Sequence, residues 1–353
     1  MSEHVWGERD TTPAAIESAL RELLKERHAE HPGFVPARVL NLIVVVDRDW
    51  RGEIENRLEQ VGRYNPSRTI LCSVEARRTT LDALATLGSE VDPEPGSDNF
   101  ALGRERIVIE CGPEHLEHLD TVCDALVVPD LATVVWSPHQ HPEAVDSLKR
   151  LTQVVLLDSV EEPSIESGLR RARELAERAY VVDLAWLRST PWRERITASF
   201  DPEPWRSELR RIAGVTVRHH PESGIAGLML FGWLASRLGW KPGAMIAEGG
   251  SLHGNAGGGR QDVRLRLEPD ATMRVPGLAG ITVDTASGMS LSLDRGPGGL
   301  TAKRATRKGE QSQWTVMGAS RGEGGILGEG IRQALLRDPT YAPALAAASA
   351  MMA

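Results

Sequence analysis

Short apolar runs alternate with stretches of helical spacing through the first half of the chain. Five runs of this kind occur at Val39–Val46, Thr69–Val74, Arg106–Cys111, Thr133–Trp136 and Val154–Asp158. Between them, apolar positions that recur every three or four residues predict helices at Glu53–Val61, Thr80–Leu87, Glu114–Leu126 and Glu143–Leu151. Strands of this kind form parallel sheets that are buried on both faces. We therefore predict an N-terminal open, mostly parallel, Rossmann-like α/β domain.

Two amphipathic helices are predicted outside this alternating region. Thr12 suits the cap and Pro13 the first position of a helix near the N-terminus, with Ile16 and Leu20 on its apolar face. The second helix is predicted at Ser164–Tyr180, where charged residues occupy the face opposite the apolar one.

The second half of the chain has a different pattern. A strand is predicted at Val215–His219, followed by a helix at Ile225–Leu238 that has almost no polar face and is therefore expected to be buried. From Asp262 to Arg307 apolar and polar positions alternate, with glycine-rich connections, which is typical of antiparallel strands with one solvated face. Two helices are predicted to follow, at Ile326–Arg337 and Tyr341–Met352. We expect two domains, a Rossmann-like domain at 1–190 and an α+β domain with an antiparallel sheet at 191–353.

Composition and charge narrow the classes of partner. The 353 residues include 49 acidic and 41 basic side chains, a formal net charge of −8, which does not favour binding to nucleic acid or to an anionic membrane. The longest uncharged apolar run, Gly224–Ser236, is shorter than the roughly 20 residues of a membrane span. We see no signal peptide, and the three cysteines do not resemble a disulfide framework, so we expect a cytoplasmic protein with buried, inert thiols.

The turn after the first strand of an α/β domain is where a dinucleotide would bind. Here it runs from Asp47 to Gly52, with two aspartates, a tryptophan and one late glycine. A pyrophosphate needs glycines at this turn, so that backbone amides can approach it, and acidic side chains oppose its charge. We predict no cofactor.

Two further patterns were tested for a site. The glycine-rich stretch Gly249–Gly259 lacks the lysine and the following helix of a phosphate-binding loop, and we predict a flexible loop there. Cys111, His115, His118 and Cys123 have zinc-like spacing, but on a helix Cys123 lies in the apolar stripe and His118 points away from it. We predict no metal site and no catalytic residues.

Several segments together resemble the glucose-6-phosphate dehydrogenase assembly protein family (OpcA). They are ARVLNLIV at 37–44, NPSRTIL at 65–71, VPDLATVVWSP at 128–138, DLAWLRSTPWRERI at 183–196 and GLMLFGWLASRLGW at 227–240. The resemblance implies a non-enzymatic partner protein that binds glucose-6-phosphate dehydrogenase, favours its active oligomer and so controls entry into the oxidative pentose phosphate pathway. The alternative is an enzyme or a sugar-phosphate- or nucleotide-binding protein that uses the crevice of the α/β sheet.

Three residues are candidate partner contacts. Trp136 stands at the carboxyl end of a predicted strand, where it either covers the core or contacts a ligand or partner. Arg68 opens a neighbouring strand, either as part of a turn or as a contact. Trp192 either packs between domains or anchors a partner, in line with the excess of tryptophan (nine, against four Phe and three Tyr).

Overall fold

The computed structural model describes residues 3–62, 66–89, 101–139, 141–258, 262–296, 298–317 and 322–353. The chain folds into two compact units, and each unit is built from three segments that are separate in the sequence. Unit 1 contains Met1–Leu157, Arg178–Val182 and Glu323–Leu336, and unit 2 contains Asp158–Glu177, Asp183–Gly322 and Arg337–Ala353. The division into domains at 1–190 and 191–353, with a single boundary between them, stays a prediction.

The sheet of unit 1 has the strand order of a dinucleotide-binding fold. Its strands are β1 (Glu3–Glu8), β2 (Phe34–Pro36), β3 (Leu40–Asp47), β4 (Ser67–Val74), β5 (Asp82–Ser89), β6 (Ala101–Cys111), β7 (Thr133–Trp136), β8 (Val154–Leu157) and β9 (Tyr180–Asp183). They pair in the order β1-β5-β6-β4-β3-β7-β8-β9, with β2 beside β6. The pairs β6–β4, β4–β3, β3–β7 and β7–β8 are parallel, whereas β1–β5 and β5–β6 are antiparallel. From β6 to β9 the order is 3-2-1-4-5-6 when β1, β2 and β5 are left out, as in doubly wound folds. The prediction of an α/β fold with a mostly parallel first sheet is confirmed.

Short helices connect these strands. They are α1 (Pro13–Glu30), η1 (Arg48–Trp50), α2 (Arg51–Gly62), η2 (Pro113–His118), α3 (Leu119–Cys123), α4 (Pro142–Ser147) and η3 (Leu148–Arg150), and α10 (Gly322–Leu336) also belongs to this unit almost entirely. The start of α1 is as predicted, because the Thr12 hydroxyl accepts a hydrogen bond from the Ala15 N–H at 3.3 Å and Pro13 holds the first position. Ile16 and Leu20 are buried on its inner face.

The helix predicted at Thr80–Leu87 is wrong, because this segment is strand β5. Its buried positions are Leu81, Ala83, Ala85 and Leu87, which have a period of two rather than three or four. Over so few residues, the apolar residues of this segment could also belong to a short helix. The segment forms a strand because its backbone pairs with β1 and β6.

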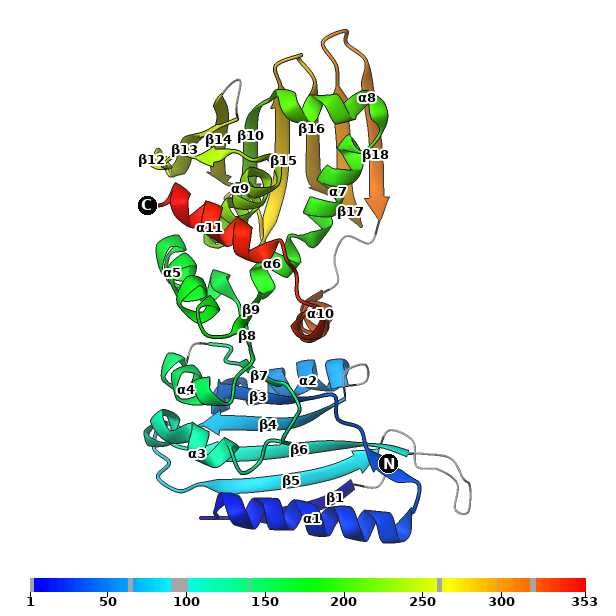
Figure 1. Ribbon diagram of the computed structural model, residues 1–353, viewed down its shortest axis with the longest axis vertical. Helices are drawn as coiled ribbons and strands as arrows, with labels where there is room; N and C mark the ends of the chain where they lie inside the picture. The colour runs from blue at the N-terminus through cyan, green and yellow to red at the C-terminus, as the bar shows by residue number, and fades with distance from the viewer. Residues whose placement is uncertain are drawn as a thin grey trace. The chain divides into compact units, whose positions relative to one another are not determined.

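Unit 2 is built on a second, mainly antiparallel sheet (Figure 1). Its strands are β10 (Ile212–His219), β11 (Lys241–Pro242), β12 (Ile246–Glu248), β13 (Ser251–Gly257), β14 (Asp262–Pro269), β15 (Leu278–Thr285), β16 (Ser290–Gly296), β17 (Gly299–Ala305) and β18 (Gln311–Met317). They pair in the order β11-β13-β14-β10-β15-β16-β17-β18, with β12 beside β13, and only β10–β14 is parallel among these pairs. The predicted C-terminal antiparallel strands are confirmed.

Unit 2 also contains helices, several of which cover one face of this sheet (Figure 1). Its helices are η4 (Ser159–Glu161), α5 (Ile165–Ala176), α6 (Leu184–Arg188), α7 (Thr190–Phe200), α8 (Glu203–Arg206), η5 (Ser207–Arg211), η6 (Pro221–Ser223), α9 (Gly224–Leu238) and α11 (Tyr341–Met351). Figure 1 shows α7, α8, α9 and α11 lying over the same side of the strands. The apolar helix α9 is buried as predicted, and it packs so closely on the sheet that a Cβ at Gly227 would lie 2.4 Å from Leu267 Cδ1. No helix among the described residues combines the length and apolar character needed to cross a membrane.

The flexible loop predicted at Gly249–Gly259 is for the most part a β-hairpin. Gly249 and Gly250 form the turn between β12 and β13 with φ of +59° and +83°, a conformation that only glycine adopts readily. Residues 251–257 form β13, and Gly259 lies outside the described residues. The glycines serve the tight turn and the close packing of this strand.

Candidate functional site

The carboxyl edge of the parallel strands in unit 1 is the place where a fold of this order presents a site. Strands β3, β4, β6 and β7 all end at this edge, at Asp47, Val74, Cys111 and Trp136. In open α/β sheets, ligands bind in the crevice beyond these ends. The side chains that fill this edge therefore decide what the unit can bind.

Three arginines and three carboxylates form a connected network there. Arg78 contacts Glu75 at 2.8 Å, Glu110 at 2.9 Å and Asp82 at 2.5 Å. Arg51 contacts Glu110 at 2.8 Å, and Arg48 contacts Glu75 at 2.6 Å. Hydrogen bonds from Arg48 and Arg78 lower the pKa of Glu75. The positive charges that could bind a phosphate at this edge are thus already paired with carboxylates of the same chain.

An aromatic stack lies at the same edge. The rings of Trp50, in the turn after β3, and His139, after β7, stack with centroids 4.6 Å apart and planes 20° apart. His139 has a φ of +64°, in the left-handed region, and Trp50 remains 45 % exposed. Close by, His141 Nε2 lies 3.3 Å from a carboxylate oxygen of Asp47. A large exposed aromatic side chain, held in place by a neighbouring ring, is suited to contact another molecule.

The geometry of this edge does not fit a dinucleotide. The turn from Asp47 to Gly52 presents side chains where backbone amides would have to approach a pyrophosphate. Within the described part of the chain, no group of three or more His, Cys, Asp or Glu side chains is arranged to hold a metal ion. What the edge offers is a charged, hydrogen-bonded surface with one exposed aromatic anchor.

Trp136 lies inside the sheet, with 3 % of its surface exposed. It pairs with Val44 of β3 on one side and with Leu156 of β8 on the other. Of the two interpretations that the sequence left open, this burial favours packing. Its role as a partner contact stays a prediction.

Arg68 is also buried, in a network at the beginning of β4. Its Nε donates to Glu105 at 2.9 Å and its Nη1 to the Leu126 carbonyl oxygen at 2.8 Å. Glu105, 1 % exposed, also accepts hydrogen bonds from Arg38. Burial alone would raise the pKa of Glu105, but the hydrogen bonds from Arg38 and Arg68 outweigh it and the pKa is lowered.

The structure does not bring Arg68 and Trp136 together. Their partners in β3 are Asn41 and Val44, three positions apart, so the two side chains lie on opposite faces of the sheet. A contact role for Arg68 also stays a prediction, and its hydrogen bonds favour a structural role.

Trp192 is buried within unit 2, in α7. Near it in sequence, Trp186 donates a hydrogen bond from Nε1 to Asp338 at 2.8 Å, and the guanidinium of Arg193 lies 3.6 Å from the Trp186 ring centroid. The family segment at 183–196 therefore packs its aromatic side chains inside this unit. Trp192 as a partner anchor remains untested.

The three cysteines are buried, as predicted. A hydrogen bond with Cys123 and burial raise the pKa of Cys72, and burial raises the pKa of Cys111 to about 12. Because the thiolate is the reactive form, these two thiols are inert near neutral pH.

Asp183 is the most strongly perturbed carboxyl group of unit 2. It accepts hydrogen bonds from the Ala185 N–H at 2.9 Å, the Ser159 N–H at 3.2 Å and the Tyr341 hydroxyl at 3.4 Å. Burial, with the nearby charge of Asp158, raises its pKa to about 6. The folded chain thus holds this proton more tightly than the unfolded chain does.

The stability of the Asp183→Asn variant, relative to that of wild type, should therefore increase as pH rises. The stabilisation from the raised pKa is complete below the ordinary value of 3.8 and is lost as pH rises through about 6. Between pH 4 and 7.5 we expect the stability of the variant relative to wild type to rise by on the order of 2 kcal/mol. Urea unfolding at a series of pH values measures it. The exposed Asp201→Asn is the control, and equal pH profiles for the two variants would contradict the assignment.

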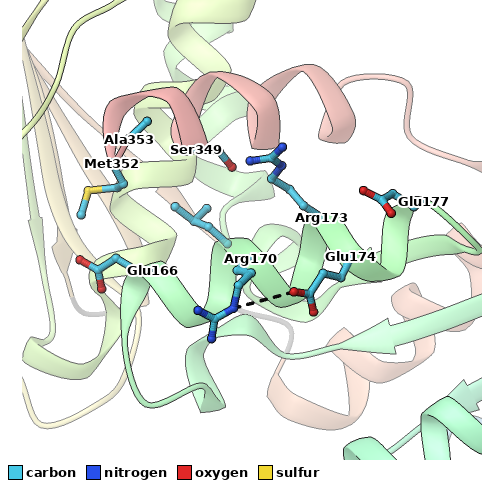
Figure 2. Close-up of a pocket in the computed structure, with 9 residues that line it drawn as sticks. Glu166, Arg170, Arg173, Glu174, Glu177, Ser349, Met352 and Ala353 are labelled. Carbon is cyan, nitrogen blue, oxygen red and sulfur yellow. Dashed lines mark ion pairs between the residues drawn. The ribbon is translucent and has the colours of Figure 1, made fainter.

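Figure 2 shows a charged cavity of about 370 Å³ between α5 and the end of α11. Glu166, Arg170, Arg173 and Glu174 line it from α5 and Glu177 from the residue that follows the helix, and Arg170 lies 3.8 Å from Glu174. The Arg173 side chain extends toward Ser349 of α11 (Figure 2). Both signs of charge line this cavity, so its side chains select no ligand class.

Comparison with known families accounts for most of the chain. The profile for the N-terminal domain of the family described as "Glucose-6-phosphate dehydrogenase subunit" matches residues 58–174. The profile for the C-terminal domain of the same family matches residues 179–345. The two matches follow one another in the order expected for one protein of this family.

Relatives named OpcA, provisionally assigned to the OxPP cycle, occur in Synechococcus elongatus, Nostoc punctiforme and a Synechocystis species. The Synechococcus elongatus protein is 28 % identical over 248 residues, which are 68 % of this chain and 52 % of that protein. The Nostoc punctiforme protein is 31 % identical over 139 residues, 38 % of this chain and 30 % of that protein. The matched region thus spans about half of the first relative and less than a third of the second.

Solved structures resemble the chain only distantly. Scyllo-inositol dehydrogenase from Lactobacillus casei has a TM-score of 0.43 at 11 % identity, covering 89 % of this chain and 96 % of that one. The provisionally assigned oxidoreductase yvaA from Bacillus subtilis has a TM-score of 0.49 at 12 % identity, covering 88 % and 95 %. No functional argument follows from likeness at this level. On the two family matches and the named relatives, the chain belongs to the glucose-6-phosphate dehydrogenase assembly protein family, OpcA.

Proposed function

We propose that this chain is a non-enzymatic assembly factor that binds glucose-6-phosphate dehydrogenase, promotes its active oligomer and so raises its activity. The observation that carries the proposal is the pair of family matches, which extend from residue 58 to 345 with a gap of four residues. The aligned parts of the relatives are incomplete, so the partner and the activity are inferred from the family.

The carboxyl edge of unit 1 supports a binding role over a catalytic one. Its arginines Arg48, Arg51 and Arg78 are paired with carboxylates, and its turn lacks the glycines of a dinucleotide site. Calorimetry of the chain alone with NADP should show no saturable binding. Binding of NADP at micromolar concentration would contradict the non-enzymatic part of the proposal.

Trp50 is the contact that this structure favours. Unlike Trp136 and Trp192, it is 45 % exposed, and its stack on His139 fixes its orientation before binding. Pre-ordered aromatic side chains lose little conformational entropy on binding and dominate many interfaces. Sequence reasoning did not select Trp50; its place in a polar turn with no apolar neighbour was the available signal.

Trp50→Ala should weaken dehydrogenase binding at least about thirtyfold, or roughly 2 kcal/mol, while the melting temperature changes little. Titration of dehydrogenase activity, with light scattering to follow its oligomeric state, measures the effect. The control is Ile246→Ala, which removes an apolar side chain that is 69 % exposed on β12. Equal activation by wild type and Trp50→Ala would exclude Trp50 as the anchor. No binding of the dehydrogenase by wild type would overturn the proposed function.

A further inference from the structure

One face of the unit 2 sheet has no helix on it among the described residues. Along β14, Val263, Leu265 and Leu267 are buried toward the helices, while Arg264 and Arg266 between them are exposed. The neighbouring strands continue the same alternation, so the polar positions form one surface across seven strands, from β13 to β18. The size and charge pattern of this polar face can be read from the strand register.

The centre of the polar face is flat. The row that crosses its middle consists, in the order of the strands, of His253, Arg266, Thr216, Thr282, Ser292, Lys303 and Gln313. Short hydroxyl side chains therefore occupy β10, β15 and β16, and longer side chains stand on both sides of them. A surface of this shape lets a second flat surface approach closely.

A glycine keeps one ion pair low on the polar face. Arg218 of β10 reaches Asp294 of β16 at 2.7 Å by crossing Gly280 of β15. A Cβ at Gly280 would lie 2.5 Å from Arg218 Nη2 and 2.7 Å from Asp294 Oδ1. The Arg218–Asp294 ion pair spans three strands and neutralises two charges, and its side chains lie flat on the sheet over Gly280.

Four charges on the polar face have no such partner among the described residues: Asp262, Arg264, Asp284 and Lys303. Arg264 and Asp284 lie in one row, one strand to either side of Gly214 in β10. Both are exposed, and neither has an ion-pair or hydrogen-bond partner within the described residues. They are two strands apart, so about 9–10 Å separates their backbones.

We propose that the polar face is the interface with a second copy of this chain, packed face to face about a two-fold axis along β10. Such an axis exchanges the strands on either side of β10, so each Arg264 lies opposite the second copy's Asp284. Two symmetric ion pairs form from charges that one copy leaves unpaired, as an isologous contact requires.

The two-fold axis sets how much of the polar face the contact covers. About β10 it places β13 and β14 of one copy opposite β16 and β15 of the other, so five strands overlap and β17 and β18 lie outside the contact. Five strands at about 4.8 Å spacing, each some seven residues long at about 3.3 Å per residue, cover roughly 550 Å². A standard interface takes roughly 800 Å² from each partner, so the expected dimer is a small contact that depends on its two symmetric ion pairs.

A charge swap tests the proposal on the full chain. Sedimentation equilibrium from about 1 to 100 μM should give twice the chain mass for wild type. Arg264→Asp and Asp284→Arg should each weaken the dimer at least about tenfold, and the double variant should return to within about threefold of wild type. Thr282→Arg, which places a long charged side chain at the flat centre, should also give monomers. Arg237→Asp, the same charge change on the helix side in α9, should leave the dimer unchanged.

Thermal melting of each variant separates lost association from lost folding. The proposal is overturned if wild type is a monomer over the whole range, if single reversals leave the dimer intact, or if the double variant is as weak as the single ones. A monomeric wild type whose activation of the dehydrogenase is lost in Arg264→Asp would assign the polar face to the dehydrogenase instead. Because dimerisation is measured without the dehydrogenase, failure here leaves the proposed function standing.

Discussion

Replacing Glu105 with alanine should lower the free energy of unfolding by about 3–5 kcal/mol. The carboxylate is 1 % exposed and accepts hydrogen bonds from Arg38 and Arg68, and Arg68 is itself 5 % exposed. Removing the carboxylate leaves a buried guanidinium that keeps only the Leu126 carbonyl oxygen and a 3.4 Å contact with Glu17. Denaturant unfolding at neutral pH measures the loss.

The control for Glu105 is Glu59→Ala. Glu59 is 60 % exposed and lies 3.7 Å from Arg106, so its ion pair is screened by solvent and its loss should cost less than about 1 kcal/mol. The lowered pKa of Glu105 adds a pH test, since this stabilisation is present above the ordinary value of 4.5 and is lost as pH falls through the lower folded value. A cost for Glu105→Ala as small as for Glu59→Ala would show that the network is dispensable.

Trp136→Ala should cost about 3–5 kcal/mol of stability, because it removes a large buried side chain from β7, the strand between β3 and β8. The folded fraction of the variant should still activate the dehydrogenase, since 3 % exposure leaves little surface for a partner. Thermal melting and activity titration, done together, separate the two effects. Trp50→Ala is the matched comparison, with the opposite expected pattern: weaker binding and little change in stability.

A Trp136 variant with unchanged melting temperature and weakened activation would restore the contact interpretation. That result would require the side chain to leave the sheet when the partner binds. The experiment is therefore the direct test of the two interpretations that the sequence alone left open.

Local patterns identified the strands that are buried on both faces. The runs that became β3, β4, β7 and β8 are predominantly apolar, with only a few polar residues such as Asn41 and Ser73, and such runs have few other ways to exclude water. Segment β5 was misassigned because its period of two extends over only eight residues, and its pairing with β1 and β6 is a long-range contact.

The candidate site could be predicted only in part. That the turn from Asp47 to Gly52 is unsuited to a dinucleotide follows from residues adjacent in sequence, and it stays a prediction. The pairing of Arg51 and Arg78 with Glu110 joins residues 59 and 32 positions apart, and no local pattern encodes it. The sequence predicts an open position for Trp136, at a strand end in a crevice, whereas the folded chain buries Trp136 and leaves Trp50 45 % exposed.

By itself the sequence determined the fold class, the buried helix α9, the burial of the cysteines and, through five distinctive segments, the family. Each of these depends on the order of apolar and polar residues along the chain, which is a local property. Only the tertiary structure decided the strand order, which tryptophan is exposed, and that Arg264 and Asp284 flank β10 on a face without a helix. Exposure and pairing depend on which distant strands and helices pack against a side chain, and that information arises only when the chain has folded.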